Sequence, residues 1–187
     1  MLVCLVEERP VSAPSVVLTE EQIRSRVTEL GAQISQQLSG ELGGQPLCVT
    51  AVLDNGFMFM CDLVRRLDLP VICQFLKLES RDLIEGGRER RQILHTPITG
   101  IEGKNFLLVD AVLHTGLTLD YLVQQFRRKG ARSVRTAVLI DKPEERRVEV
   151  NADYWAFRVA GRFLVGYGMG HQELHRNLPY VGNLASS

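Results

Sequence analysis

The 187-residue sequence lacks several features that mark particular classes of protein. Lys plus Arg and Asp plus Glu are equal at 22 each, so no broad positive field exists to attract duplex DNA or anionic lipid. No apolar run approaches the roughly 18 residues of a membrane-spanning helix, and the opening MLVCLVEERP becomes charged too soon for a signal peptide. We therefore expect a cytoplasmic protein whose primary partners are neither nucleic acid nor membrane.

The four cysteines include no CxxC pair, which argues against a zinc site. Cys48 and Cys73 stand in apolar runs, where a thiol behaves as a small core residue, so we expect buried, reduced thiols. The composition, 45% hydrophobic and 24% charged, is that of a soluble globular protein. A chain of this length can bury one good core, which predicts a single domain over residues 1–187.

Apolar periodicity predicts helices that alternate with strands along the chain. Residues 1–17 have no clear period and are interpreted as an N-terminal arm. The predicted helices are 19–38, which opens with the capping-box pattern TEEQ, 58–67 and 117–128. The predicted strands are 47–53, 70–76, 105–109, 134–140, 154–159 and 163–167. This alternation predicts an α/β fold, a mostly parallel twisted sheet flanked by helices.

The segment 79–92, ESRDLIEGGRERRQ, is charged, carries a Gly pair and has no apolar period. We interpret it as a solvated loop or an exposed hairpin rather than a disordered segment. A loop of this length is uncommon in a compact domain and is often a lid, so a mobile loop is expected here.

The stretch LLVDAVLHTGLTLDYLV, residues 107–123, joins a buried-strand pattern, the turn HTGLT and a helical pattern. Such turns lie at the carboxyl ends of strands, where a helix N-terminus offers unpaired N–H groups to an anion. Gly116 allows a tight turn, and the hydroxyls of Thr115 and Thr118 can donate to phosphate oxygens. Taken alone, the pattern fits equally well a polar turn that caps the helix.

In its context, this stretch resembles the phosphoribosyl diphosphate (PRPP) signature of the type I phosphoribosyltransferases. Four further stretches, in order, resemble the hypoxanthine-guanine phosphoribosyltransferase family: TEEQI, AVLDNGFMFMCDLVRRL, VLIDKPEERR and FLVGYGMGHQELHRNLPYVG. The likeness runs from about residue 18 to residue 184. It implies a type I phosphoribosyltransferase-like fold with a small hood from the N- and C-terminal segments, a homodimer or homotetramer, and magnesium (Mg2+) as cofactor.

The resemblance also implies a set of substrate-binding residues: Asp54, Asn55, Gly56, Thr115, Gly116, Leu117, Thr118, Lys142, Phe163, Leu164 and Arg176. Residues 115–118 match the loop that binds the ribose 5-phosphate. Lys142 matches a lysine that donates to the purine 6-oxo group, Phe163 matches an aromatic residue that stacks on the base, and Leu164 lies where backbone groups meet the purine edge. Arg176 matches an arginine that binds pyrophosphate, a role that suits its forked donors.

Each of three side chains in this set has a plainer interpretation when taken singly. Lys142 could be a solvated lysine beside a turn, Phe163 a core residue and Arg176 a member of a surface ion pair. Their occurrence together and in family order favours a binding site.

Five positions depart from the family pattern, and they fall on the chemistry. Asp110 and Ala111 replace a glutamate and an aspartate that hold the ribose hydroxyls, which leaves Asp110 as the candidate metal ligand. His114 replaces an aspartate that handles the proton at N7 of the purine, work that an imidazole can also do. Asp54 replaces a Lys or Arg that follows a cis peptide bond and helps to seat pyrophosphate, and Gly170 replaces an aspartate that binds a second magnesium.

Two functions from different classes follow from this pattern. The first is purine salvage, the transfer of 5-phosphoribosyl from PRPP to hypoxanthine or guanine, giving IMP or GMP and pyrophosphate, with His114 and Asp110 as catalytic residues. The alternative is a catalytically weak or inactive relative that binds a purine nucleotide as a sensor or as a protein partner. A different base or sugar phosphate is a third interpretation, disfavoured because Lys142 and Phe163 are kept.

Overall fold

The computed structural model describes residues 13–85, 88–95, 99–172 and 174–184, and for 79–85 and 88–95 it describes the backbone alone. The central sheet contains β2 (Leu47–Leu53), β3 (Val71–Glu85), β4 (Arg88–His95), β5 (Asn105–Leu113), β6 (Ser133–Asp141) and β7 (Tyr154–Arg158). Their order in the sheet is β4-β3-β2-β5-β6-β7. The strands β3, β2, β5, β6 and β7 are parallel to one another, and β4 pairs with β3 in the antiparallel direction. The predicted mostly parallel α/β sheet is confirmed.

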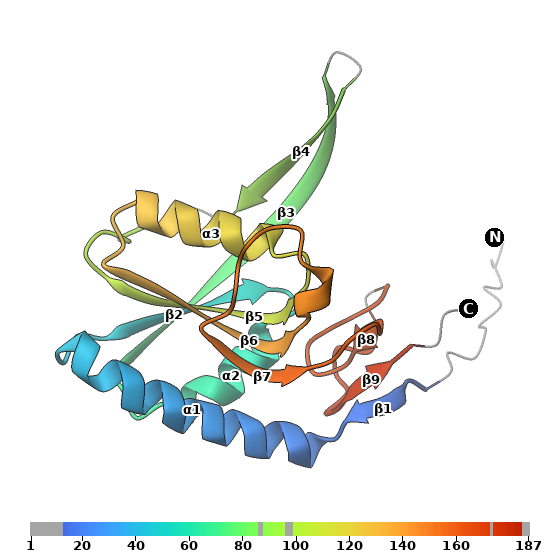
Figure 1. Ribbon diagram of the computed structural model, residues 1–187, viewed down its shortest axis with the longest axis horizontal. Coiled ribbons are helices and arrows are strands. Elements are labelled where there is room, and N and C mark those ends of the chain that lie inside the picture. The colour runs from blue at the N-terminus through green and yellow to red at the C-terminus, as the bar shows by residue number, and fades with distance from the viewer. Residues whose placement is uncertain (1–12, 86–87, 96–98, 173, 185–187) are drawn as a thin grey trace, which may run out of the picture.

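Helices cover both faces of this sheet (Figure 1). α1 (Glu20–Leu42) and α2 (Phe57–Val64) pack on one face, where their apolar side chains join one buried cluster, and α3 (Leu117–Arg128) packs with a second cluster on the other. α1 begins with the predicted capping box, in which Thr19 and Gln22 each accept a hydrogen bond from the other's backbone N–H. α2 ends before the predicted Leu67 because the chain turns at Arg65 and Arg66.

The terminal segments form a separate antiparallel sheet of β1 (Ser15–Leu18), β9 (Val181–Asn183) and β8 (Leu164–Val165), which confirms the predicted hood. The predicted strand 163–167 shortens to two residues because Gly166 and Tyr167 adopt positive φ angles of 92° and 48° and turn the chain. Most of the N-terminal arm, residues 1–12, lies outside the described residues.

The segment 79–92 is part of a β-hairpin, one of the two structures expected for it. β3 continues past the predicted end at Leu76 to Glu85, and β4 pairs with it from Leu78–His95 to Glu85–Arg88. The hairpin projects from the body of the domain (Figure 1), and the Gly pair at 86–87 lies outside the described residues. Closure of this segment over a site stays a prediction.

The prediction of buried thiols is correct for Cys48 and wrong for Cys73. Cys73 is exposed on β3, where Ile72 and Phe75 are exposed as well. The apolar run 70–76 indicated a core position for Cys73, but the Ile72, Cys73 and Phe75 side chains belong to neither buried cluster. Cys61 is half-buried, and Cys4 lies outside the described residues.

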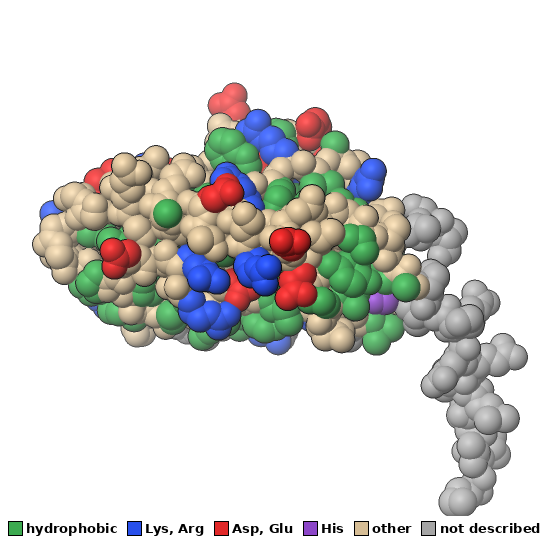
Figure 2. All heavy atoms as spheres, turned by 90° about the horizontal axis from the view of Figure 1, so that it is seen from below, with side chains coloured by type: hydrophobic (Ala, Val, Ile, Leu, Met, Phe, Trp, Pro, Cys, Tyr) green, Lys and Arg blue, Asp and Glu red, His purple; other side chains and the backbone are tan. Residues whose placement is uncertain are grey.

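One face of the molecule illustrates the charge balance of the chain. Lys, Arg, Asp and Glu side chains are interspersed on it, with apolar side chains between them (Figure 2). Within the described ranges, no helix is both long enough and apolar enough to cross a membrane.

Two glycines of α1 should respond in opposite ways to the same substitution. A Cβ added at Gly31 would lie 2.5 Å from the Arg66 Cβ and 2.8 Å from the Arg66 carbonyl oxygen, whereas one added at Gly40 meets nothing within 4 Å. We expect Gly31→Ala to lower the free energy of unfolding by about 1–3 kcal/mol through overpacking. Gly40→Ala should raise it by up to about 1 kcal/mol through helix propensity. Urea denaturation measures both, and equal gains would contradict the close approach at Gly31.

Candidate functional site

The order of the parallel strands determines where a ligand can bind. The chain moves outward from β2 to β3 on one side and from β5 through β6 to β7 on the other, so the order reverses between β2 and β5. Ligands of open α/β sheets bind at such a switch point, beyond the carboxyl ends of the strands. The segments that begin at Asp54, His114 and Lys142 all leave the sheet at this edge.

The loop after β2 packs directly on the end of β5. The Leu53–Asp54 peptide bond is cis, as the resemblance implied. A Cβ at Gly56 would lie 2.9 Å from the Val52 carbonyl oxygen and 3.0 Å from that of Val109, so this close approach requires glycine. Asp54 and Asn55 are exposed. Gly56 was expected among the substrate-binding residues, but its N–H donates to the Val52 carbonyl oxygen at 2.9 Å and is not free for a ligand.

The loop after β5 has the form of an anion-binding turn. Gly116 is the N-cap of α3 in the left-handed conformation, with φ 85°, and no side chain caps the helix there. A Cβ at Gly116 would lie 2.4 Å from Val150 Cγ1. Thr115 and Thr118 are half-buried and Leu117 is exposed. The first-turn N–H groups of a twelve-residue helix are therefore open to a ligand, which favours the anion-site interpretation over the capped turn.

Asp110 and Ala111 lie at the end of β5 and differ in environment. Ala111 is fully buried in the cluster beneath α1 and α2. Asp110 is partly buried, and its Oδ1 accepts a hydrogen bond from the Ala111 N–H at 2.7 Å. Burial raises the pKa of Asp110 from 3.8 to about 7, against the lowering effect of hydrogen bonds from the Ala111 and Val112 N–H groups.

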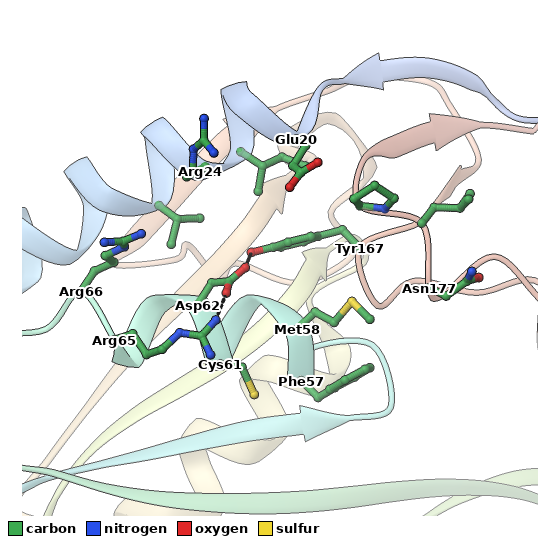
Figure 3. Close-up of a pocket in the computed structure, with 14 residues that line it drawn as sticks. Glu20, Arg24, Phe57, Met58, Cys61, Asp62, Arg65, Arg66, Tyr167 and Asn177 are labelled. Atoms are coloured by element: carbon green, nitrogen blue, oxygen red, sulfur yellow. Dashed lines mark hydrogen bonds and ion pairs between the residues drawn. The ribbon is translucent and has the colours of Figure 1, made fainter.

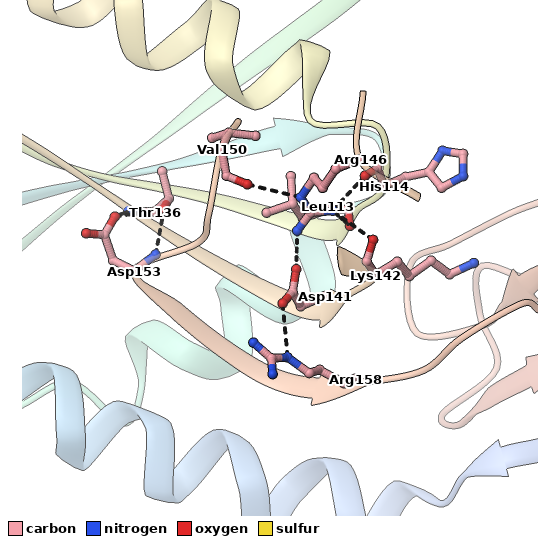
Figure 4. Close-up of polar contacts among 9 residues, drawn as sticks. All are labelled: Leu113, His114, Thr136, Asp141, Lys142, Arg146, Val150, Asp153 and Arg158. Atoms are coloured by element: carbon pink, nitrogen blue, oxygen red, sulfur yellow. Dashed lines mark hydrogen bonds and ion pairs between the residues drawn. The ribbon is translucent and has the colours of Figure 1, made fainter. Parts of the chain in front are cut away.

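Arg146 joins the ends of β5 and β6 (Figure 4). Its Nη1 donates to the carbonyl oxygens of Leu113 and His114 at 2.6 Å each and to that of Lys142 at 3.0 Å. Its Nη2 donates to the buried carboxylate of Asp141, which also accepts from Arg158 Nε at 3.2 Å. One guanidinium therefore sets the position of the phosphate loop relative to Lys142.

Lys142 is buried, with 6% of its surface exposed, and its ammonium has two partners. Nζ donates to the Arg162 carbonyl oxygen at 2.8 Å and to Glu145 Oε1 at 3.2 Å. Glu145 lies in the short 3-10 helix η1 (Pro143–Glu145), and its Oε2 contacts His114 Nε2. The plainer interpretation of Lys142 as a solvated lysine is therefore wrong, because the chain around it closes over the aliphatic stem.

Phe163 follows the residue whose carbonyl holds Lys142, and it does not lie in the core. Its side chain is 54% exposed and its ring lies edge-on to His171, with centroids 5.0 Å apart. Leu164 is half-buried and pairs with Asn183 in the hood sheet. An exposed aromatic ring, on the residue after the carbonyl that binds Lys142, can serve as a platform for a planar ligand.

Arg176 meets the loop after β2. Its Nη1 donates to Asn55 Oδ1 and to the Gly168 carbonyl oxygen, the latter at 2.8 Å. A Cβ at Gly170 would lie 2.8–3.0 Å from the Arg176 side chain, so the guanidinium occupies space that a side chain at 170 would need. The structure thus joins Arg176 to Asn55, and it gives Arg176 no carboxylate partner within the described residues.

A hollow lies away from the carboxyl edge of the sheet, between α1, α2 and the C-terminal segment (Figure 3). It is a cleft of about 460 Å³ in which Tyr167 donates to Asp62, and Arg24, Arg65 and Arg66 stand at its rim. Burial raises the pKa of Tyr167, and its hydrogen bond to Asp62 adds to the effect. None of the sequence-predicted site residues lines this cleft, so it does not belong to the site at the carboxyl edge.

The sequence model of the phosphoribosyl transferase domain family matches residues 18–172, which is most of the chain. The chain belongs to the phosphoribosyltransferase family. It is 34% identical to the hypoxanthine-guanine phosphoribosyltransferase of Bacillus subtilis (strain 168), over 90% of this chain and 92% of the relative. It is 37% identical to that of Streptococcus mutans, over the same shares.

Solved structures of the family have the same fold. The hypoxanthine phosphoribosyl transferase of Trypanosoma cruzi superposes with a TM-score of 0.83 at 33% identity, covering 95% of this chain and 94% of that one. A hypoxanthine-guanine phosphoribosyltransferase of Bacillus anthracis superposes with a TM-score of 0.77 at 30% identity, covering 91% and 98%.

Sequence reasoning missed Glu145, Arg146 and Asp141, which hold the predicted residues in place. All three stand in the stretch VLIDKPEERR that carried the resemblance. The available signal was the spacing of Lys142 and Glu145, since residues three apart face each other across a helical turn. No comparable signal pointed to Arg146, because its partners are backbone carbonyls.

The pKa of Asp110 predicts a pH-dependent stability. Because that pKa is raised from 3.8 to about 7, the folded state binds this proton more tightly than the unfolded state. Its stabilising contribution is complete below about pH 4 and is lost as the pH rises through 7. At pH 8 the Asp110→Asn variant should therefore have a higher free energy of unfolding than the wild type. This difference should shrink by up to about 1.4 kcal/mol for each unit by which the pH is lowered. Urea denaturation from pH 5 to 8 measures this, with Glu144→Gln as an exposed control, and a constant margin would contradict it.

Proposed function

We propose that the chain transfers the 5-phosphoribosyl group of PRPP to hypoxanthine or guanine, giving IMP or GMP and pyrophosphate. The observation that carries the proposal is the meeting of an uncapped helix N-terminus with Lys142 and Phe163 at one edge of the sheet. These are the groups that a purine nucleotide needs for its phosphate, its 6-oxo group and its ring. The names of the relatives support the same substrates.

In this reaction N9 of the purine attacks C1′ of the ribose while the bond from C1′ to the pyrophosphate oxygen breaks. Thr115 to Thr118 hold the 5-phosphate through hydroxyls and first-turn N–H groups. Lys142 donates to the 6-oxo group, and Phe163 stacks on the ring, with Leu164 beside it. His114 receives the proton from N7 of the base.

Arg176 and Asn55 lie where the departing pyrophosphate is expected. The Arg176 guanidinium supplies positive charge and forked donors for it, which offset the exposed carboxylate of Asp54. The Gly56 N–H takes no part, since it is bonded to Val52.

The donors present fit a magnesium ion that is held chiefly by its substrate. Asp110 is the one carboxylate at the end of β5, and among the described residues no group of three His, Cys, Asp or Glu side chains could hold a metal. Mg2+ commonly binds through one or two carboxylates plus substrate phosphates and water. When bound, the ion would neutralise charge on the pyrophosphate, and Asp110 would hold both ion and ribose.

A homodimer or homotetramer is part of this proposal. The exposed side chains of Ile72 and Phe75 provide apolar surface on β3. Light scattering after gel filtration measures the mass of the assembly, and a monomer at all concentrations would contradict this part alone.

The test is a single-turnover reaction with enzyme in excess of PRPP, magnesium and hypoxanthine or guanine. We expect nucleotide product in the wild type and a loss of about 100-fold or more in Lys142→Ala, because the base loses its charged donor. Lys129→Ala, at an exposed lysine just after α3, is the matched control and should keep full activity.

If no product forms, a titration with GMP shows whether the site still binds a purine nucleotide. Tight GMP binding without product would overturn the transfer reaction in favour of a purine-nucleotide sensor or protein partner. Absence of both product and binding would overturn the assignment of the site.

A further inference from the structure

Glu145 lies between the two side chains that the proposed function directs at the purine. Its Oε1 accepts from Lys142 Nζ at 3.2 Å, and its Oε2 contacts Nε2 of His114. Its own segment is held in place, since the Arg146 side chain bonds to the backbone of both His114 and Lys142. One carboxylate thus ties the loop after β5 to the segment after β6.

An ionised carboxylate can only accept hydrogen bonds, so its contact with His114 determines the hydrogen on the imidazole. Partial burial raises the pKa of Glu145, but hydrogen bonds from Lys142 and His114 outweigh it and hold the pKa below its usual range. Nε2 of His114 is therefore the nitrogen that carries hydrogen toward Glu145. In a neutral ring, Nδ1 is then the nitrogen with a free lone pair.

The same carboxylate restrains Lys142. The ammonium has three N–H donors, and Glu145 and the Arg162 carbonyl oxygen use two of them. One donor is left for a ligand. In a purine nucleotide, N7 and O6 lie side by side on one edge of the ring. An acceptor for the N7 proton and a donor to O6 must therefore be held close together, as Glu145 holds His114 and Lys142.

We propose that Glu145 is a positioning residue for phosphoribosyl transfer, which holds His114 with its hydrogen on Nε2 and aligns it with Lys142 along the N7–O6 edge. This inference rests on the proposed function. As the N9–C1′ bond forms and pyrophosphate departs, the N7 proton passes to Nδ1 of His114. The resulting imidazolium is stabilised by the Glu145 carboxylate, in the way that a buried aspartate supports the histidine of a serine protease.

The kinetic test compares Glu145→Gln in two backgrounds. In the wild type we expect kcat to fall by about 10- to 100-fold, with the KM for PRPP within about twofold, because proton transfer is impaired and phosphate binding is not. In a His114→Asp background a carboxylate replaces the imidazole, so no ring hydrogen needs to be fixed. The amide oxygen introduced by Glu145→Gln can still accept from Lys142 Nζ, so this change should cost no more than about twofold there.

Two further variants separate positioning from charge and from folding. Glu145→Asp keeps the carboxylate and should recover part of the lost kcat. Glu144→Gln is the matched control, since Glu144 is exposed in the same short helix and makes no hydrogen bond or ion pair with any described residue. An equal loss in both His114 backgrounds, or an equal loss in Glu144→Gln, would overturn the proposal.

A nuclear magnetic resonance readout keeps this inference separate from the proposed function. The ring-nitrogen shifts of His114 at pH 8 should show hydrogen on Nε2 in the wild type and a mixture of the two forms in Glu145→Gln. A ring that carries its hydrogen on Nδ1 alone would overturn the proposal even if the wild type turns over. If the wild type carries its hydrogen on Nε2 but shows no turnover, the pairing of His114 with Glu145 would stand and its role in phosphoribosyl transfer would be refuted.

Discussion

Five parallel strands whose order reverses between β2 and β5 are the constraint on which the site depends. Parallel strands end at one edge, so the reversal places the loops after β2, β5 and β6 beside each other. Two close contacts then hold these loops in fixed positions relative to each other. Gly56 lies against the β5 backbone, and Arg146 bonds to the carbonyls that end β5 and β6.

The departures from the family pattern form a consistent electrostatic picture rather than a set of separate losses. Ala111 is buried among apolar side chains, and a carboxylate there would carry a burial cost. Asp110 is left with a raised pKa, so it holds its charge weakly until cations approach it. His114 replaces one carboxylate of the family pattern, and Glu145 brings another carboxylate into contact with it. Arg176 packs against Gly170, where no side chain competes for the space.

Elements with strong local signals were well predicted. The predicted bounds of α3 agree with the structure, and the capping box of α1 is present, because both depend on residues a few positions apart. Predictions failed where burial depends on a distant neighbour. The apolar run around Cys73 indicated a buried thiol, yet Cys73 and its neighbour Phe75 are exposed on β3. Phe163, for which a core position was the plainer interpretation, has more than half of its surface exposed.

The sequence by itself determined the alternation of strands and helices and the tight turn at Gly116, since these follow from periodicity and turn chemistry, and its motifs named the candidate site residues. It also showed which charges had changed. Only the tertiary structure decided what those changes lie next to. The pairing of His114 with Glu145, the burial of Lys142 and the bridge made by Arg146 join residues on different segments, and contacts of that kind are determined by chain packing rather than by any local pattern.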